Sequence, residues 1–401
     1  MTDSPAGALA GLKVLDLTRV LAGPSATQIL GDLGADVVKV ERPDVGDDTR
    51  KWGPPFLQDA DGADTTESAY YLSANRNKRS IAIDFTQEDG RALLRRLVAQ
   101  ADVLVENYKL GDLARYGLGY DDLKDEFPAL IYCSITGFGQ TGPYAARAGY
   151  DYLVQAMGGI MSLTGPTDGE PMKVGVAIAD LMTGTYATIG ILAALDHRRR
   201  TGRGQMVDLA LLDTQVAWLS NAGQYYLTSG VPTPRTGNGH PTIVPYQAFR
   251  AADEYLILAV GNDSQFAKFC DVAGRPELAA DSRFATNQAR VRNREVLVPI
   301  VAGLIAEKPR GFWLEALEAR HVPCGPINTI DEVFADPQVV ARGMRIEMPH
   351  PLAPDPVALI GSPIRLSETP VSYRHAPPAC GADGVEVLRD WLGELNPASG
   401  R

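Results

Sequence analysis

The chain has 401 residues, of which 45% are hydrophobic and 22% are charged, a composition typical of a globular protein. This composition excludes a disordered, collagen-like or coiled-coil protein. The net charge is -11 and the longest basic run is the triplet Arg198 to Arg200, which argues against a nucleic-acid or anionic-membrane surface as the main function.

Short apolar runs alternate with helical patterns over the first 136 residues. Strands are predicted at 13–17, 36–40, 80–83, 103–105 and 130–135, and helices at about 25–33 and 87–100. Strands that alternate with helices at this spacing indicate a parallel sheet with helices on both faces. We therefore expect a doubly wound, Rossmann-like α/β core.

A long helix is predicted from about Asp180 to Arg200, because apolar residues keep helical spacing and glycines follow the basic triplet. Its uncharged stretch, 181–195, is expected to be too short and too polar to span a bilayer. The chain then becomes rich in glycine, proline and threonine from about 229 to 250, which is typical of a domain boundary. Beyond it, a strand is predicted at 256–260 and helices at about 265–273, 291–306 and 384–392.

Four cysteines lie far apart in the sequence, and the five histidines show no metal-ligand spacing. We predict free thiols in a reducing compartment and no metal site. The first residues carry neither a basic segment nor an apolar core of signal-peptide length, so we expect a soluble, cytoplasmic protein.

Gly137, Gly139 and Gly142 form a Gly-x-Gly-x-x-Gly pattern directly after a predicted strand. A dinucleotide site would need a helix that opens at the third glycine. Pro143 follows at once and no apolar stripe forms before Gly149, which argues against nicotinamide or flavin binding. These glycines are instead expected to let a loop approach another segment closely.

Asp180 follows six small or apolar residues and precedes the predicted long helix. One interpretation is an N-cap, in which the carboxylate accepts backbone N–H groups and suits the helix dipole. The other is a carboxylate held at a helix start as a covalent nucleophile. The two roles are compatible, and the residues alone leave both open.

Further motifs recur in order along nearly the whole chain, beginning with Gly11-Leu-Lys-Val-Leu-Asp-Leu-Thr-Arg-Val-Leu-Ala-Gly-Pro24. The others lie at 30–42, 75–80, 102–107, 113–117, 136–140, 149–151, 175–180, 190–195, 201–205 and 322–326. Together they resemble the class III coenzyme A transferases, a family that includes carnitine dehydratase, bile-acid-inducible and formyl-CoA transferase-like members.

The resemblance implies a CoA transferase in which the aspartate matching Asp180 attacks an acyl-CoA thioester. An aspartyl anhydride and then an aspartyl-CoA thioester form, and a small carboxylic acid takes over the CoA. It implies CoA and acyl-CoA as substrates, with no permanently bound cofactor. Such intermediates must be kept from water, and the loop of Gly237, Gly239 and His240 is expected to close over them by analogy.

Positions that match the CoA-binding residues of the family are Leu21, Ala22, Arg42, Asn107 and Arg115. Further candidates for CoA contact are Ile83, Lys109 and Arg147, near the expected adenine or pantetheine path, and Tyr150. Arg42 and Arg115 are the expected phosphate partners, because guanidinium groups bind phosphate bidentately. Leu21 departs from the oxalate-using members, which carry glutamine there. This difference argues against formate/oxalate exchange.

Two alternatives to the transferase come from other classes. The first is α-methylacyl-CoA racemase, which this chain also resembles overall and which has an aspartate at the Asp180 position. The racemase uses a histidine as acid/base where this chain has Tyr150. A phenol with a pKa of about 10 is a poor partner for proton transfer at neutral pH. The second is a non-catalytic CoA-binding protein, which would need no nucleophile.

The resemblance also implies a large Rossmann-like domain formed by both chain ends and a smaller α+β domain. The expected boundaries are 1–200 for the first part of the large domain, 201–225 for a linker, 226–320 for the small domain and 321–401 for the returning part. The family dimer, two chains threaded through each other, is expected here.

Overall fold

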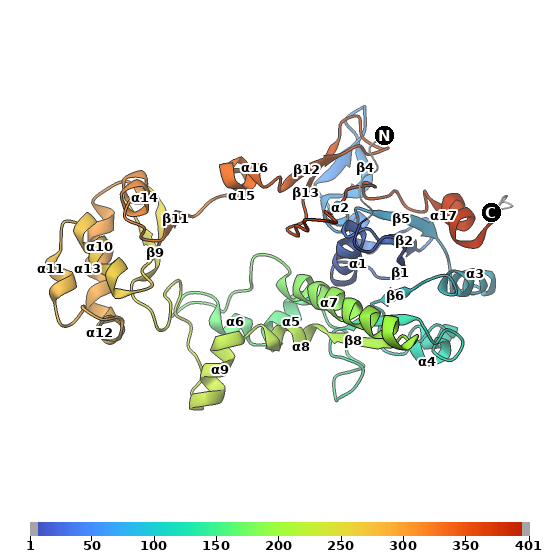
Figure 1. The fold of residues 1–401 in the computed structure, drawn as a ribbon, viewed down its shortest axis with the longest axis horizontal. Coiled ribbons are helices and arrows are strands. Elements are labelled where there is room, and N and C mark those ends of the chain that lie inside the picture. Colours follow the sequence, from blue (N-terminus) through green and yellow to red (C-terminus); the bar gives the residue numbers. More distant parts are fainter. Residues whose placement is uncertain (1–6, 395–401) are drawn as a thin grey trace. The chain divides into compact units, whose positions relative to one another are not determined.

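The computed structural model describes residues 7–394, which divide into two compact units (Figure 1). The first unit contains residues 7–160, 174–231 and 338–394, and therefore draws on both ends of the chain. The second contains 161–173 and 232–337. The division differs from the expected boundaries, because 201–225 belongs to the first unit and 161–173 to the second.

A six-stranded parallel sheet organises the first unit, in the order β5-β2-β1-β6-β7-β8. Its strands are β1 (Lys13–Asp16), β2 (Asp36–Glu41), β5 (Lys78–Ala82), β6 (Val103–Glu106), β7 (Ile131–Thr136) and β8 (Met206–Ala210). The α/β prediction and all five predicted strands of this sheet are confirmed, whereas β8 lies in the segment expected to be a linker. The strand order reverses between β1 and β6, so a crevice is expected at the carboxyl ends of these two strands.

The sheet is buried on both faces. The helices are α1 (Ala22–Asp32) and α7 (Ile178–Thr201) on one face, and α3 (Glu88–Val98) and α17 (Gly384–Leu392) on the other. Val14 packs into the α1/α7 core, whereas its neighbour Leu15 packs into the α3/α17 core. Successive strand side chains point to opposite faces, which explains why these strands are continuous apolar runs.

Helices α1 and α7 cross closely at Gly184. A Cβ atom on this residue would lie 2.3 Å from Ser25 Oγ and 2.6 Å from the carbonyl oxygen of Ala22. Glycine therefore allows the second turn of α7 to approach the first turn of α1.

Helix α7 has 24 residues, so it is longer than the uncharged stretch 181–195 on which the expectation about membrane crossing was based. The helix includes residues before and after the uncharged stretch, and it passes a length and composition test for a membrane span. In the structure its Ala187 and Ile191 are buried in the core of the first unit. A core helix of a soluble protein passes the same test.

Shorter elements complete the first unit. They are η1 (Asp48–Lys51), β3 (Phe56–Gln58), β4 (Asp64–Ser68), α2 (Ala69–Ser73), η2 (Ala114–Tyr116), α4 (Tyr120–Leu123), α5 (Asp151–Met157), α8 (Leu211–Ala217), α9 (Ser220–Ser229), β12 (Arg345–Met348) and β13 (Val357–Ile360). The returning chain reaches strands β5 and β2 through α17. Arg79 of β5 pairs with Asp390 at 2.9 Å, and Trp391 Nε1 donates to Asp36 Oδ2 of β2 at 2.8 Å.

The second unit has an antiparallel sheet in the order β11-β10-β9. Its elements are β9 (Tyr246–Arg250), β10 (Tyr255–Ala259), α10 (Asp263–Val272), α11 (Glu277–Ala280), α12 (Asn287–Arg292), α13 (Arg294–Ala306), α14 (Arg310–Glu318), β11 (Cys324–Pro326) and α15 (Ile330–Ala335). Two short helices, α6 (Ile160–Leu163) and α16 (Pro337–Ala341), span the limits between the units. The helix predicted at 291–306 is confirmed as α13 except at its start. Asn293 leaves the helical conformation and its side chain donates to the carbonyl groups of Arg283 and Ala289, which separates α12 from α13.

Candidate active site

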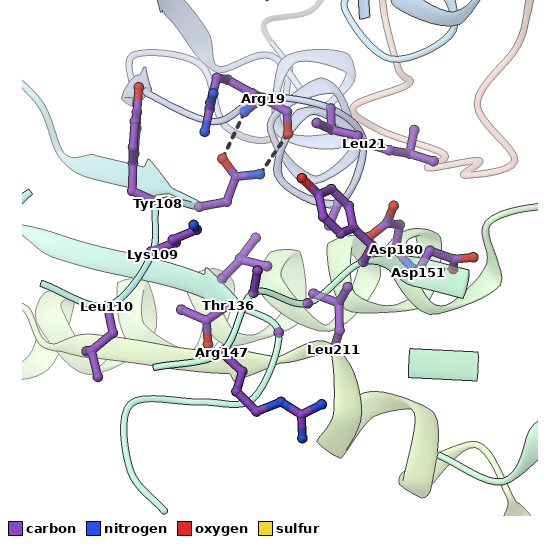
Figure 2. Close-up of a pocket in the computed structure, with 18 of the residues that line it drawn as sticks. Arg19, Leu21, Tyr108, Lys109, Leu110, Thr136, Arg147, Asp151, Asp180 and Leu211 are labelled. Atoms are coloured by element: carbon purple, nitrogen blue, oxygen red, sulfur yellow. Dashed lines mark hydrogen bonds between the residues drawn. The ribbon is translucent and has the colours of Figure 1, made fainter. Parts of the chain in front are cut away.

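A pocket of about 460 Å³ lies at the carboxyl ends of β1, β6 and β7, where the strand order reverses. The turn that follows β1 and the segment that follows β6 form two of its walls (Figure 2). The start of α7 brings Asp180 into the same pocket. The pocket therefore occupies the position that open parallel sheets favour for ligands.

Asp180 is the third residue of α7, whose N-cap position is Ala177. Its side chain is half-buried, and within the described part of the chain its carboxylate accepts no hydrogen bond. The N-cap interpretation of Asp180 is therefore wrong: its carboxylate is a free group at the pocket wall.

Asp151, the first residue of α5, caps α7 instead. Its Oδ1 accepts the backbone N–H of Ala179 at 2.8 Å and that of Asp180 at 3.3 Å. Gln155 holds the other carboxylate oxygen by donating from Nε2 at 2.7 Å, and its own Oε1 accepts the N–H of Val174. A carboxylate from a neighbouring helix thus satisfies the exposed donors at the start of α7.

The pKa of Asp180 is raised to about 7, first by burial and second by the negative charge of Asp151. Burial disfavours the charged form of a carboxyl group, and a like charge adds to that effect. Asp180 consequently titrates close to neutral pH. A carboxyl group with this property, in a pocket and without fixed partners, is suited to nucleophilic or proton-transfer chemistry.

Most residues predicted to bind CoA line this pocket. They are Leu21, Ala22, Asn107, Lys109, Arg147 and Tyr150. Asn107 clamps the backbone of Arg19, since its Oδ1 accepts the N–H at 2.9 Å and its Nδ2 donates to the C=O at 2.7 Å (Figure 2). Arg147 packs against the rings of Phe138 and Tyr144.

Three predicted CoA residues do not line the pocket. Arg42 lies just beyond β2 and pairs with Asp48 at 2.7 Å. Arg115 is exposed in η2 and pairs with Asp112 at 2.7 Å. The side chain of Ile83 is 3% exposed and packs in the α3/α17 core, because this position falls on the core face after β5.

The two carboxylates paired with these arginines, Asp48 and Asp112, both line the pocket. Arg42 and Arg115 are therefore each separated from the pocket by one side chain, that of their aspartate partner. The position of Ile83 does not support its assignment to the CoA site.

Sequence reasoning missed Arg19 and Tyr108. The Arg19 guanidinium lies 4.9 Å from the ring centre of Tyr108, and its Nη1 is 3.0 Å from Asp48 Oδ2. Arg19 follows the predicted strand 13–17, two residues before Leu21, and Tyr108 follows the predicted strand 103–105, next to Asn107. The signal that could have found them is their place at the two strand ends that meet at the sheet's reversal point.

The glycine pattern after β7 shapes the pocket rather than a dinucleotide site. A Cβ atom on Gly137 would lie 2.5 Å from the Cα atom of Gly149, so the two loops cross with their backbones in contact. In the described chain no helix opens at Gly142, and the next one is α5, which begins at Asp151. The expected close approach is confirmed, and it fixes the loop that carries Tyr150 and Asp151.

The loop of Gly237, Gly239 and His240 belongs to the second unit. Gly237 has a φ of +58°, and Thr236 Oγ1 donates to the carbonyl oxygen of Gly239 at 2.6 Å. The N–H of His240 donates to the carbonyl oxygen of Tyr246 at 3.0 Å, which ties the loop to β9. Residues 7–394 contain no group of three or more histidine, cysteine or acidic residues arranged to hold a metal ion.

Comparison with known proteins extends these observations. The family described as CoA-transferase family III matches residues 9–384. The chain is 51% identical to the succinate–glutarate CoA-transferase of Agrobacterium fabrum, over 97% of this chain and 98% of that protein. It is 46% identical to the human succinyl-CoA:glutarate CoA-transferase, over 96% of this chain and 86% of that protein. Among solved structures, a CAIB/BAIF family protein from Brucella suis has a TM-score of 0.86 and 50% identity, over 96% of this chain and 100% of that one.

Proposed function

Because this chain belongs to CoA-transferase family III, we propose that Asp180 carries first the acyl group and then CoA during transfer from an acyl-CoA to a carboxylic acid. The observation that carries the proposal is the position of Asp180: a carboxylate without a hydrogen-bond partner in the described chain, in the pocket at the reversal point of the sheet.

In the first half-reaction an Asp180 carboxylate oxygen attacks the thioester carbonyl carbon and the CoA thiolate leaves, so a mixed anhydride forms. The thiolate then attacks the Asp180 carbonyl carbon and releases the donor acid, which leaves an aspartyl-CoA thioester. The acceptor carboxylate attacks that thioester, a second anhydride forms, and thiolate attack on the acceptor's carbonyl carbon yields the new acyl-CoA. Asp180 is regenerated, no net proton is needed and no water takes part.

Ionisation of Asp180 supports this chemistry. With a pKa of about 7, a substantial fraction of Asp180 is ionised at neutral pH, while its basicity exceeds that of an ordinary aspartate. A more basic carboxylate is the better nucleophile toward a thioester. Asp151 contributes by raising this pKa and by holding the backbone of Asp180 in place.

We propose dicarboxylic acids as the substrates, with succinyl-CoA as donor and glutarate as acceptor. The support is the printed activity of the two relatives described above. A free carboxylate at the far end of such an acid suits the cationic groups of this pocket, Arg19, Lys109 and Arg147. Arg42 and Arg115 are proposed to exchange their aspartate partners for the phosphates of CoA, and the glycine loop at 237–240 to exclude water.

We further propose a homodimer, interlocked as the family resemblance implies, and a cytoplasmic location. Support for the dimer comes from large apolar side chains exposed in the first unit, at Tyr186, Ile189 and Leu192 of α7 and at Val216 and Trp218 in and after α8. A monomer rarely exposes such a group of large apolar side chains. Four free cysteines support a reducing compartment.

Trapping of the enzyme-bound intermediate tests the nucleophile. The protein is incubated with succinyl-CoA and then with hydroxylamine, which converts an activated aspartyl group to a hydroxamate. Peptide mapping by mass spectrometry should place this modification on Asp180 and require acyl-CoA. A modified peptide elsewhere, or active enzyme without modification, would assign the chemistry to another residue or to direct transfer.

A further inference from the structure

The turn between β1 and α1 contains an unusual backbone conformation. Val20 has a φ of +71°, in the left-handed region. Among the non-glycine residues with positive φ in the described chain, Val20 alone is β-branched, the type of side chain that tolerates this region least. A conformation of this kind persists only where the surrounding structure fixes it.

A buried ion pair between Lys39 and Asp47 fixes this turn from inside the protein. Asp47 Oδ1 accepts the N–H of Val20 at 3.3 Å, and its Oδ2 receives a hydrogen bond from Lys39 Nζ at 2.9 Å. Lys39 also donates to the carbonyl oxygen of Thr18 at 2.8 Å. The side chains of Lys39 and Asp47 are 1% and 0% exposed, so the pair holds both ends of the Thr18–Val20 segment from inside the protein.

A second buried pair holds the neighbouring backbone. Lys78 Nζ donates to Asp16 Oδ2 at 3.1 Å and to the carbonyl oxygen of Pro24 in the first turn of α1 at 2.9 Å. Asp16 Oδ1 accepts the N–H of Thr18 at 2.9 Å. The turn is therefore fixed by side chains from three different strands, although it makes few backbone contacts of its own.

Stability alone does not account for buried charges at this place. Removing two charges from water is costly, and apolar side chains of similar volume commonly serve stability as well. The Lys39–Asp47 pair instead fixes the conformation of the turn, because its hydrogen bonds reach the backbone atoms on either side of Arg19. Arg19, Val20, Leu21 and Ala22 all line the pocket that holds Asp180.

We propose that Lys39 and Asp47 are positioning residues for CoA binding, which hold the left-handed Val20 turn in the shape that the CoA substrate contacts. The proposal rests on the CoA site proposed above. Neither side chain lines the pocket of Asp180, so both act through the backbone of residues 18–20.

The test compares Lys39→Met with a matched control, Arg76→Met, in the full-length protein. Arg76 forms a similarly buried pair with Asp32, with side chains 6% and 1% exposed, but it does not line the pocket or contact the turn. Affinity for CoA is measured by calorimetry well below each variant's melting temperature, and KM and kcat are measured with succinyl-CoA and glutarate.

We expect Lys39→Met to raise the Kd for CoA and the KM for succinyl-CoA at least ~10-fold, with kcat at saturation within ~3-fold of wild type. Arg76→Met should lower the melting temperature but leave both constants within ~2-fold. Adding Val20→Gly to Lys39→Met should recover at least ~3-fold of the affinity, because glycine adopts positive φ without strain. A merely structural role of Lys39 would not predict this rescue.

Three results would each overturn the proposal. Lys39→Met could bind CoA as tightly as wild type does, or Arg76→Met could weaken CoA binding by the same factor. The third is that adding Val20→Gly to Lys39→Met restores none of the affinity for CoA. If Lys39→Met does not fold, the Lys39→Met/Asp47→Asn double variant replaces it with the same expected results, since it leaves no unpaired buried charge. A wild-type protein that does not bind CoA would instead overturn the proposed function, and the two failures are thus distinguishable.

Discussion

Asp151 accepts a hydrogen bond from the backbone N–H of Asp180 while its negative charge raises the pKa of the Asp180 carboxyl. One acid thus fixes the position of another and also sets its proton affinity. The two effects arise from the same carboxylate, because an oxygen that caps the start of α7 is necessarily close to the side chain on its first turn.

The pH profile of catalysis tests this electrostatic coupling. In wild type, kcat/KM should rise with pH through an apparent pKa of about 7, because the attacking form of Asp180 is the ionised one. Asp151→Asn removes a charge but keeps an acceptor for Ala179, so the acid limb should move down by about one pH unit. Initial rates from pH 5 to 9 measure this shift of the acid limb, and Asp151→Glu is the control that keeps the charge. An unmoved acid limb in Asp151→Asn would show that burial alone sets the pKa.

Replacement of Asp180 should separate activity from stability. Asp180→Asn and Asp180→Ala should each lose at least ~10³-fold in transfer rate, equivalent to ~4 kcal/mol of barrier, because no other group carries the intermediates in the proposed mechanism. Near wild-type transfer by either variant would contradict the nucleophile assignment.

The same Asp180→Asn variant should be more stable than wild type at alkaline pH. The folded pKa of Asp180 is raised above its ordinary value, so its contribution to stability is fully present below the unfolded pKa of about 4 and is lost as pH rises through about 7. The gain in melting temperature should therefore be largest above pH 7 and shrink toward pH 4. Asp196→Asn, on the exposed part of the same helix, is the control and should show no such gain.

Assembly follows from the exposed apolar face of α7. The protein should sediment as a homodimer with twice the chain mass of 43.0 kDa. Ile189→Glu should abolish or destabilise this dimer, because Ile189 is 55% exposed in the chain and would meet the partner. Val385→Glu, at an even more exposed apolar position on α17, should leave the dimer unchanged. A concentration-dependent monomer in wild type would contradict interlocked chains, whose separation requires unfolding.

The racemase alternative predicts a different exchange reaction. With a 2-methylacyl-CoA in deuterated water, a racemase incorporates deuterium at the α-carbon, whereas we expect no exchange at a catalytic rate. The reason is Tyr150, which occupies the position of the histidine acid/base and is 67% exposed at the pocket. Mass spectrometry of the recovered acyl-CoA measures the result, and fast exchange would favour the isomerase.

The sheet was predictable because its strands are continuous apolar runs between helical patterns. The end helix at 384–392 was likewise predicted at the bounds that α17 has. β8 was missed, since this five-residue strand has a charged residue and follows directly on a long helix. Its pairing with β7 is a tertiary contact, which local sequence pattern does not report.

The position of Asp180 was predicted, but its environment was not. A capping role was a reasonable expectation for an aspartate at a helix start, yet the cap comes from Asp151, which lies 29 residues earlier in the sequence. Arg19 and the buried ion pair of Lys39 and Asp47 were missed for a related reason. Their roles depend on which strand ends meet, and that depends on sheet order rather than on any motif.

The docking of α17 on β5 has a consequence for synthesis of the chain. Arg79 and Asp36 lie among the first hundred residues, but their partners Asp390 and Trp391 are translated more than 300 residues later. A nascent chain that lacks α17 therefore exposes the apolar α3/α17 face of its sheet until α17 has been synthesised and has left the ribosome. Chaperone dependence during this interval, and loss of solubility when α17 is deleted, are the expected results of covering this sheet face with a helix so distant in the sequence.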